Sequence, residues 1–402
     1  MRPADLHDVV VVGGGPAGSA TARRLAAAGW RTLLLERGEM PRRKPCGECL
    51  NPAAVRELAR LGVLDRVREA GAVPLRGWEI GPLDRTGFRG CFPPAVHGLG
   101  IRRAVLDEIL FRAAEETGAE ARTGWQVRGP FIEDWRIAGV EALDPAGIPT
   151  TVRARLVVAA DGLRSKLVRR LRLIDRRPRT WKLALNAHVR GIPPGNDGVL
   201  KLGPGLCVGI APVDGELANV VVVLGEGRIP EAKGDSGGCF DRHLAAVIGN
   251  GGATRCEEVL ATGPFDVPVR RIVDDHLLLV GDAAGYYDPL TGQGIYRALH
   301  GAALAAGVAD RALRSPNGAT RDALRPYEDA HRRAFSPGRR MQRLVEAVTS
   351  RPAIFSPVSR ALAARPAAAD ALVAVTGDIR PVRSLASADV VLSTILPPRR
   401  PR

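Results

Sequence analysis

The chain has 402 residues, of which 45% are hydrophobic, so it can build one large domain or two ordinary ones around a substantial core. Its net charge of +15 comes mainly from scattered arginines, and only 4% of its residues are aromatic, which argues against nucleic-acid binding. We interpret the basic charge as a solvated surface, with attraction to anionic lipid or phosphate as the lesser alternative. No run approaches twenty apolar residues and the six cysteines are unevenly spaced, so we expect a cytoplasmic protein without a membrane span, signal peptide or disulfide framework.

The first predicted element is a buried β-strand that runs into a glycine-rich turn. The β-branched run from Val9 to Val12 is typical of a parallel strand buried on both faces. Gly13, Gly15 and Gly18 then form G-x-G-x-x-G. In this pattern the first glycine permits a tight turn, the second lets a pyrophosphate approach the backbone, and the third lets helix and strand pack closely.

An alanine-rich helix and a second strand complete the unit. The helix is predicted from Ser19 to Ala28, and its N-terminus would offer N–H groups and a positive dipole end to phosphates. The strand from Arg31 to Leu35 ends at Glu36, about twenty positions after the glycines. An acidic residue there suits ribose hydroxyls and repels a 2′-phosphate, so the pattern predicts FAD or NAD and disfavours NADP.

The next segment, PRRKPCGECLN from Pro41 to Asn51, carries two cysteines in C-x-x-C spacing. A zinc site is disfavoured, because Cys46 and Cys49 have no further ligands at suitable spacing, and no metal set is predicted. A redox pair is disfavoured because a dithiol–flavin relay normally comes with a second nucleotide domain, for which the sequence has no fingerprint. We favour a thiol that lines an active site, with a small buried hydrophobic side chain as the alternative.

Three further motifs follow in chain order. RRAVLDEIL contains Arg103 and Asp107, and VVAADGLRS ends a strand at Asp161 and Gly162. The segment LLLVGDAAGYYDPLTGQGI has a strand from Leu277 to Val280, then Gly281, Asp282 and the Pro289 bend, and a helix that begins near Gly292.

The remaining regions lack such motifs. Residues 176–262 alternate apolar and polar side chains between glycines and prolines, which predicts antiparallel strands. After Arg325 the chain reads as helical, and it ends in a Pro/Arg tail predicted to be flexible. His188, His243, His276 and His300 are possible acid–base groups but fall in no recognisable constellation.

Together these motifs resemble those of the flavoprotein family of p-hydroxybenzoate hydroxylase. The closest resemblance is to geranylgeranyl reductases and their relatives. It is carried by the K-x-C-G pattern of Lys44, Cys46 and Gly47 and by the late glycine motif. The resemblance implies that Asp282 binds the flavin ribitol and that the helix near Gly292 stabilises charge on the flavin ring. Catalytic residues would be Cys46, Pro289 and Gly292. Residues implied in FAD binding are Gly13, Gly15, Pro16, Ala17, Gly18, Glu36, Arg37, Arg103, Val127, Asp161, Gly162, Gly281, Asp282, Gly292, Gly294 and Ile295.

We therefore predict a mixed α/β (α+β) fold, with a Rossmann-like FAD-binding domain, an inserted antiparallel-sheet substrate domain and a helical C-terminal region. The FAD domain is expected to comprise 1–75, 100–175 and 265–330, the substrate domain 76–99 and 176–264, and the C-terminal region 331–402.

The favoured function is an NAD(P)H-driven, FAD-dependent reductase of a C=C bond in a bulky lipophilic isoprenoid or polyketide-type substrate. A single dinucleotide fingerprint implies that NAD(P)H binds transiently. The alternative is a monooxygenase that hydroxylates an aromatic or polyketide ring through a C4a-hydroperoxide, and a minor alternative is a non-enzymatic redox switch. Flavin-dependent halogenases also resemble the Gly47–Leu50 segment, but the chain lacks their W-x-W-x-I-P segment and a lysine near Trp78. The sequence leaves the oligomeric state open and allows peripheral contact with a membrane.

Overall fold

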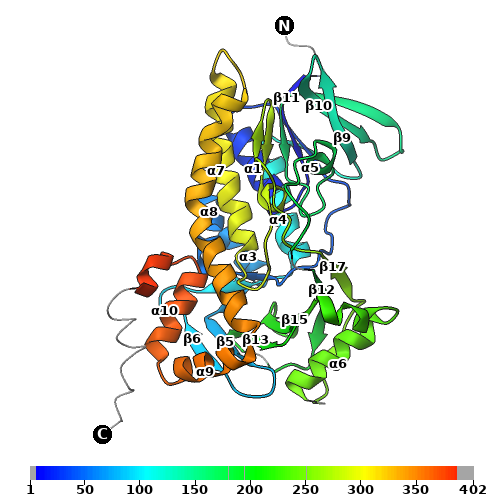
Figure 1. Ribbon diagram of the computed structural model, residues 1–402. Helices are drawn as coiled ribbons and strands as arrows, with labels where there is room; N and C mark the ends of the chain where they lie inside the picture. The colour runs from blue at the N-terminus through cyan, green and yellow to red at the C-terminus, as the bar shows by residue number, and fades with distance from the viewer. Residues whose placement is uncertain (1–5, 180, 194, 250, 387–402) are drawn as a thin grey trace.

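The computed structural model describes residues 6–179, 181–193, 195–249 and 251–386. Figure 1 shows two parts, one above the other, with the long helices α7 (Gly294–Arg314) and α8 (Arg321–Thr349) running along one side. The upper part contains the N-terminal strand and the lower part a second sheet with α6 (Ser236–Ile248).

The upper sheet has the strand order β18-β19-β11-β1-β2-β8, in which all neighbours from β19 to β8 run parallel. A hairpin of β9 and β10 extends antiparallel from β11. Its strands are β1 (Leu6–Val12), β2 (Thr32–Leu35), β8 (Glu120–Arg122), β9 (Gln126–Glu133), β10 (Arg136–Leu143), β11 (Pro149–Ala159), β18 (Val273–Asp274) and β19 (Leu277–Leu279). Since Val9, Val10 and Val11 are fully buried, β1 forms the centre of the core, as its apolar run predicts.

Helices pack around this sheet. Helix α1 packs against both α4 and α7, and α7 packs in turn against α8. The helices and short turns of this part are α1 (Pro16–Ala27), α2 (Pro52–Arg60), α3 (Leu64–Glu69), α4 (Arg103–Glu116), α5 (Lys166–Arg170) and the 3-10 turn η2 (Gly281–Ala284). A small sheet of β3 (Cys49–Leu50), β7 (Gly98–Gly100) and β4 (Val73–Leu75) links the cysteine segment to this part.

The lower sheet has the order β16-β12-β15-β14-β13-β5-β6, and β17 pairs with β12. Its strands are β5 (Gly77–Pro82), β6 (Phe88–Cys91), β12 (Lys182–Arg190), β13 (Asp197–Gly203), β14 (Leu206–Pro212), β15 (Leu217–Gly225), β16 (Thr254–Arg255) and β17 (Leu260–Thr262). One face packs on α6 through Phe240 and Leu244. Three further elements complete this part: α9 (Pro352–Ala363) and α10 (Pro366–Thr376), which pack on β5 and β6, and η1 (Glu226–Ala232).

The mixed α/β fold class is confirmed, but local details differ from the sequence predictions. Helix α6 lies inside 176–262, where we expected only strands; Asp235 caps it by accepting a hydrogen bond from the backbone N–H of Gly238. Strands β13 and β5 pair in parallel, so the lower sheet is mixed. Helix α7 begins at Gly294, two residues after the expected start. Helix α8 continues through residue 330, where we placed a domain boundary, and the Pro/Arg tail lies outside the described residues.

Candidate active site

The two glycine motifs line one cavity of about 320 Å³. Gly15 and Ala17 follow β1, while Gly281 and Asp282 follow β19, and all of them face this space. Because β1 and β19 lie in one sheet and both run parallel to the intervening β11, their carboxyl ends meet at the same edge. Ligands of open α/β sheets bind outside this edge.

The glycines of the first motif have distinct environments. A Cβ on Gly18 would lie 1.8 Å from the carbonyl oxygen of Gly13, and Gly13 itself has a φ of +104°. These two glycines are therefore required by packing and backbone conformation. A Cβ on Gly15 would meet only the Arg42 guanidinium, at 3.6 Å. Gly15 caps α1 without a side-chain hydrogen bond, so the helix N-terminus is available to an anion.

Glu36 lies behind this loop and is 4% exposed. Its carboxylate accepts hydrogen bonds from the backbone N–H of Gly14 at 2.7 Å and of Gly38 at 3.0 Å. The Arg42 guanidinium lies 3.3 Å from the same carboxylate and 3.6 Å from that of Asp107. Glu36, which follows β2, thus holds the glycine-rich turn that follows β1.

Several predicted FAD contacts do not line the cavity. Arg37 is exposed, Val127 is buried in β9, and the Asp161 carboxylate accepts a hydrogen bond from the backbone N–H of Lys166 at the start of α5. Of the predicted site residues, those that line the cavity are Gly15, Pro16, Ala17, Cys46, Arg103, Gly162, Gly281, Asp282, Pro289, Gly292, Gly294 and Ile295.

Arg103 brings a buried positive charge to the cavity. Its guanidinium makes two hydrogen bonds of 2.9 Å to Asp107, one turn further along α4. Burial acts to lower the pKa of Arg103, but Asp107 and the neighbouring Cys46 thiol raise it above its usual value. Burial lowers the pKa of Lys44, which also lines the cavity, and the nearby Arg103 lowers it further. This wall of the cavity therefore carries two basic side chains, of which Arg103 is paired with Asp107.

The cysteine segment lies against the second glycine motif at the cavity. The Cys46 thiol accepts a hydrogen bond from the backbone N–H of Glu48 at 3.4 Å. The Cys49 sulfur lies 3.3 Å from where a Cβ of Gly292 would stand, and Gly292 has a φ of +64°. Burial, together with Cys46, raises the pKa of Cys49 to about 12, so this thiol stays protonated at neutral pH.

The lower sheet supplies the opposite wall. Residues at alternate positions of β13 and β15 point into the cavity. On β15, the intervening residues point to the other face of the sheet and pack toward α6. The aliphatic side chains on the cavity side include Leu200, Leu202, Val221 and Val223. A sheet that is apolar on both faces fits a core on one side and a lipophilic ligand on the other.

A polar cluster that was not predicted from the sequence also lines the cavity. The Lys182 ammonium lies 2.6 Å from the Asp288 carboxylate and 2.5 Å from that of Glu346. Tyr287 donates a hydrogen bond to Glu346 and does not line the cavity, whereas Asp288 and Tyr286 do.

The cysteines and possible metal ligands are distributed as follows. All six cysteines are free thiols. Within the described ranges, Glu231, Cys239 and His243 converge at η1 and α6, on the side of the lower sheet remote from the cavity. Cys239 is fully buried in the core there.

The fold and the shared cavity define a dinucleotide-binding flavoprotein. The model of the FAD binding domain family matches residues 7–308, and the chain belongs to this family. The protein is an FAD-dependent oxidoreductase, and the resemblance to geranylgeranyl reductases is confirmed by its relatives.

The chain is similar to several named proteins. It is 30% identical over 346 residues to digeranylgeranylglycerophospholipid reductase of Methanospirillum hungatei, which covers 82% of each chain. It is 30% identical over 378 residues to menaquinone reductase of Mycobacterium tuberculosis, covering 86% of this chain and 85% of the relative. Conditioned medium factor receptor 1 of Dictyostelium discoideum is 28% identical over 75% of this chain, which spans 62% of that protein's length.

Two solved structures share the fold. A geranylgeranyl bacteriochlorophyll reductase-like protein from Thermoplasma acidophilum has a TM-score of 0.74 at 23% identity, covering 98% of this chain and 97% of that one. A myxobacterial chondrochloren halogenase has a TM-score of 0.75 at 25% identity, and the match covers 85% of this chain and 82% of that one. In the part of the chain that the structure describes, no helix has the length and hydropathy needed to cross a bilayer.

Proposed function

We propose that the protein uses NAD(P)H as a transient reductant and reduces a C=C bond of a bulky lipophilic substrate of isoprenoid or polyketide type. The observation that carries this proposal is the aliphatic face of the lower sheet, which lies opposite the two glycine motifs across one cavity. The relatives named as reductases of digeranylgeranylglycerophospholipid and menaquinone support it. Bound FAD would supply hydride transfer.

The residues present fit a flavin dinucleotide. Gly15 leaves room for a ligand at the N-terminus of α1, where backbone N–H groups would hold the pyrophosphate. Glu36 would accept a hydrogen bond from a ribose hydroxyl and Asp282 from the ribitol. Helix α7 starts at Gly294 without a side-chain cap, and Gly294 and Ile295 line the cavity. Their N–H groups would stabilise negative charge on the flavin ring.

The remaining predicted residues would act around this frame. Arg103 lines the cavity beside Cys46 and would hold the flavin side of the site electropositive. Pro289 and Gly292 shape the turn before α7, where the backbone N–H of Gly292 donates to the carbonyl of Pro289 at 3.0 Å. Gly162, beside Lys44, would face the approaching nicotinamide nucleotide. Cys46, or a water held by it, would stand on the side from which the substrate carbon takes up its proton.

The decisive experiment identifies the product. The FAD-loaded protein is mixed with NADPH or NADH and a prenylated lipid or menaquinone, and the product is analysed by mass spectrometry. Gain of two hydrogen atoms per turnover, without oxygen uptake, is expected. Gain of one oxygen atom with oxygen consumption would instead establish the monooxygenase alternative. Cys46→Ala should lower the rate of turnover, whereas the control Cys256→Ala, at an exposed position outside the cavity, should not.

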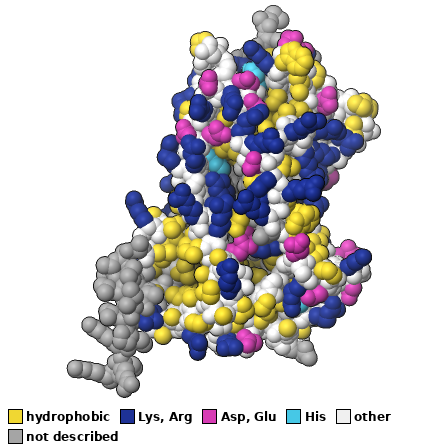
Figure 2. Space-filling model, in the orientation of Figure 1, with side chains coloured by type: hydrophobic (Ala, Val, Ile, Leu, Met, Phe, Trp, Pro, Cys, Tyr) yellow, Lys and Arg dark blue, Asp and Glu magenta, His cyan; other side chains and the backbone are white. Residues whose placement is uncertain are grey.

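We further propose that the face formed by α8 and α9 touches a membrane surface. Leu344, Ile354 and Val358 are exposed there by 59%, 44% and 38%. Arg343 and Arg351 lie beside them in the sequence, and Glu346 and Ser350 of the same region line the cavity. Figure 2 shows hydrophobic side chains gathered on the lower part of the molecule, where these helices lie. Such a face suits an anionic bilayer that holds the substrate.

Vesicle sedimentation tests this contact. Leu344→Asp with Ile354→Asp should release the protein from vesicles that contain phosphatidylglycerol. A control substitution at Trp135, which is fully exposed between β9 and β10 in the other part of the molecule, should leave binding unchanged. Equal binding by both variants would overturn the proposal.

A further inference from the structure

Glu48, within the cysteine segment, is unusual in both backbone and environment. It is a non-glycine residue with a φ of +54°, and it is only 4% exposed. Left-handed backbone and burial of a carboxylate are each unfavourable unless specific partners compensate. A residue that combines both is held by its surroundings.

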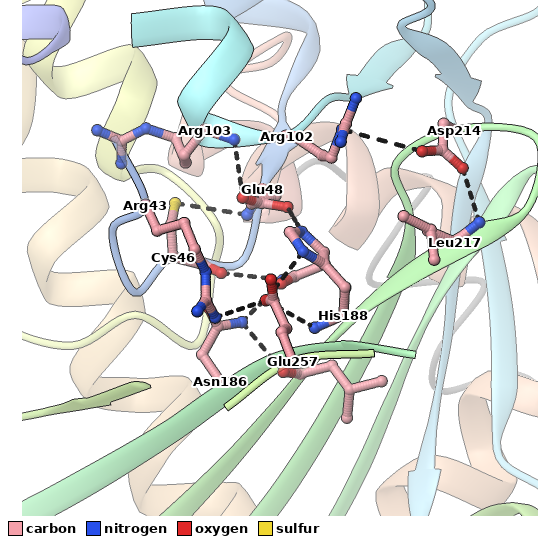
Figure 3. A network of polar contacts seen from close by, with 12 residues as sticks. Arg43, Cys46, Glu48, Arg102, Arg103, Asn186, His188, Asp214, Leu217 and Glu257 are labelled. Atoms are coloured by element: carbon pink, nitrogen blue, oxygen red, sulfur yellow. Dashed lines mark hydrogen bonds and ion pairs between the residues drawn. The ribbon is translucent and has the colours of Figure 1, made fainter. Parts of the chain in front are cut away.

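Every polar group of Glu48 has such a partner (Figure 3). Its backbone N–H donates to the Cys46 sulfur at 3.4 Å, and its carbonyl accepts from the backbone N–H of Ile101 at 3.1 Å. One carboxylate oxygen accepts from the backbone N–H of Arg103, in the first turn of α4, at 2.7 Å. The other lies 2.6 Å from Nε2 of His188 on β12. Glu48 therefore joins the cysteine segment to both parts of the molecule.

His188 is held between two carboxylates. Its Nδ1 lies 3.0 Å from Glu257, which also accepts from the His188 backbone N–H at 3.2 Å. Arg43, from the cysteine segment, pairs with the same Glu257 oxygen at 2.7 Å. Burial acts to lower the pKa of His188, but the two carboxylates outweigh it and raise the pKa. The charged groups that face the imidazole are Glu48, Glu257 and Arg43; Arg103 presents its backbone, since Asp107 holds its guanidinium.

The sheet also holds Cys46 directly. The Asn219 side chain, on β15, donates to the Cys46 carbonyl at 2.9 Å, and Asn186 on β12 donates to Asn219 at 2.6 Å. Thus the carbonyl of Cys46 is bound by the sheet, while its sulfur is bound by the backbone of Glu48. The contact of the carbonyl depends on the cysteine segment staying docked on β15, whereas the contact of the sulfur lies within the segment.

We propose that Glu48 and His188 are positioning residues, whose hydrogen-bonded pair docks the cysteine segment on the lower sheet and so keeps the Cys46 thiol in the cavity. The inference rests on the proposed function in one respect, that a thiol at this place serves turnover. The docking itself follows from the contacts above. A glutamine at position 48 could still accept from Arg103, but it would not pair with a charged imidazole, so Glu48→Gln removes the charge with little change in shape.

The test measures alkylation of individual cysteines by iodoacetamide in the FAD-loaded protein, with peptide mapping by mass spectrometry. Glu48→Gln and His188→Gln should each raise the rate at Cys46 by about tenfold, the effect of losing one hydrogen bond between charged groups. The double variant should exceed neither single one, since both changes break one pair. His243→Gln is the matched control, because His243 pairs with the exposed Glu231 on the far side of the sheet.

Internal references separate docking from general loosening. Cys207 is enclosed in the cavity wall and should stay unlabelled, while the partly exposed Cys91, on β6 at the edge of the sheet far from β12, should react equally in all variants. In the wild-type protein, the rate at Cys46 relative to Cys91 should rise as the pH increases through the raised pKa of His188, and this rise should be absent from His188→Gln. An unchanged rate at Cys46, or labelling of Cys207 in step with it, would overturn the proposal. Because this readout needs no substrate, it tests the docking even if the proposed reaction is wrong. In the proposed reaction, Glu48→Gln and His188→Gln are each expected to lower kcat at unchanged KM.

Discussion

Replacing Gly15 with alanine separates ligand binding from folding at the first glycine motif. Gly15 has φ −80° and ψ −176°, which alanine adopts without strain, and a Cβ there meets only a mobile guanidinium at 3.6 Å. The free energy of unfolding of the apoprotein should therefore change by no more than about 0.5 kcal/mol. If the FAD pyrophosphate lies on this backbone, the added methyl group costs about 1–3 kcal/mol of binding, which raises Kd by roughly fivefold to 150-fold.

Two measurements on the same apoprotein check this prediction: thermal unfolding, and titration with FAD followed by flavin fluorescence. Gly18→Ala is the contrasting control. Its Cβ would lie 1.8 Å from the carbonyl oxygen of Gly13, so it should destabilise the apoprotein itself by about 3 kcal/mol. A Gly15→Ala protein that binds FAD as tightly as the wild type would refute the placement of the pyrophosphate at this turn.

Two further predictions concern buried carboxylates. Lys182→Met should destabilise the protein by about 3–5 kcal/mol near neutral pH, because Asp288 and Glu346 lose their shared cation. Chemical denaturation should show this loss shrinking on acidification, since burial raises the pKa of Asp288, and a loss independent of pH would contradict the ion-pair explanation. Burial raises the pKa of Asp378 to about 7, although the hydrogen bond from Asn51 acts to lower it. The Asp378 carboxyl therefore binds its proton more tightly in the folded protein than in the unfolded chain. The free energy of unfolding should fall as the pH rises from about 4 to about 7, and Asp378→Asn should flatten this slope, which a pH series of unfolding curves would detect.

The parts of the site that could be predicted from the sequence are those encoded by local backbone requirements. Gly13 and Gly18 must be glycine for reasons of conformation and close approach, so their spacing identifies the turn without any tertiary information. The buried run of β1 likewise shows in the sequence as consecutive β-branched residues. Because parallel strands align their carboxyl ends, two such motifs also predict that distant segments meet at one edge.

Side-chain pairs that join distant segments could not be predicted in this way. Glu48 and His188 are separated by 140 residues, and Lys182 and Glu346 by 164. No periodicity or glycine marks either pair, since each depends on how the lower sheet docks on the upper part. Helix α6 is different, because a signal was present: Asp235 is a good N-cap, and Phe240 and Leu244 have helical spacing. Gly237 and Gly238 in its first turn masked that signal.

The location of these unpredicted pairs indicates that the two walls of the cavity serve different roles, one toward the cofactor and one toward the substrate. The wall formed by the upper part includes glycines of both motifs, where backbone can approach a ligand closely, and this suits the FAD that the FAD binding domain family binds. The lower sheet supplies aliphatic side chains, and from its strand β12 Lys182 and His188 make long-range polar contacts with Asp288 and Glu48, which line the cavity. Substitutions on the sheet can therefore change the substrate or the orientation of Cys46 without disturbing the dinucleotide turn. Related chains with one fold and different named reactions are expected to differ mainly on this wall.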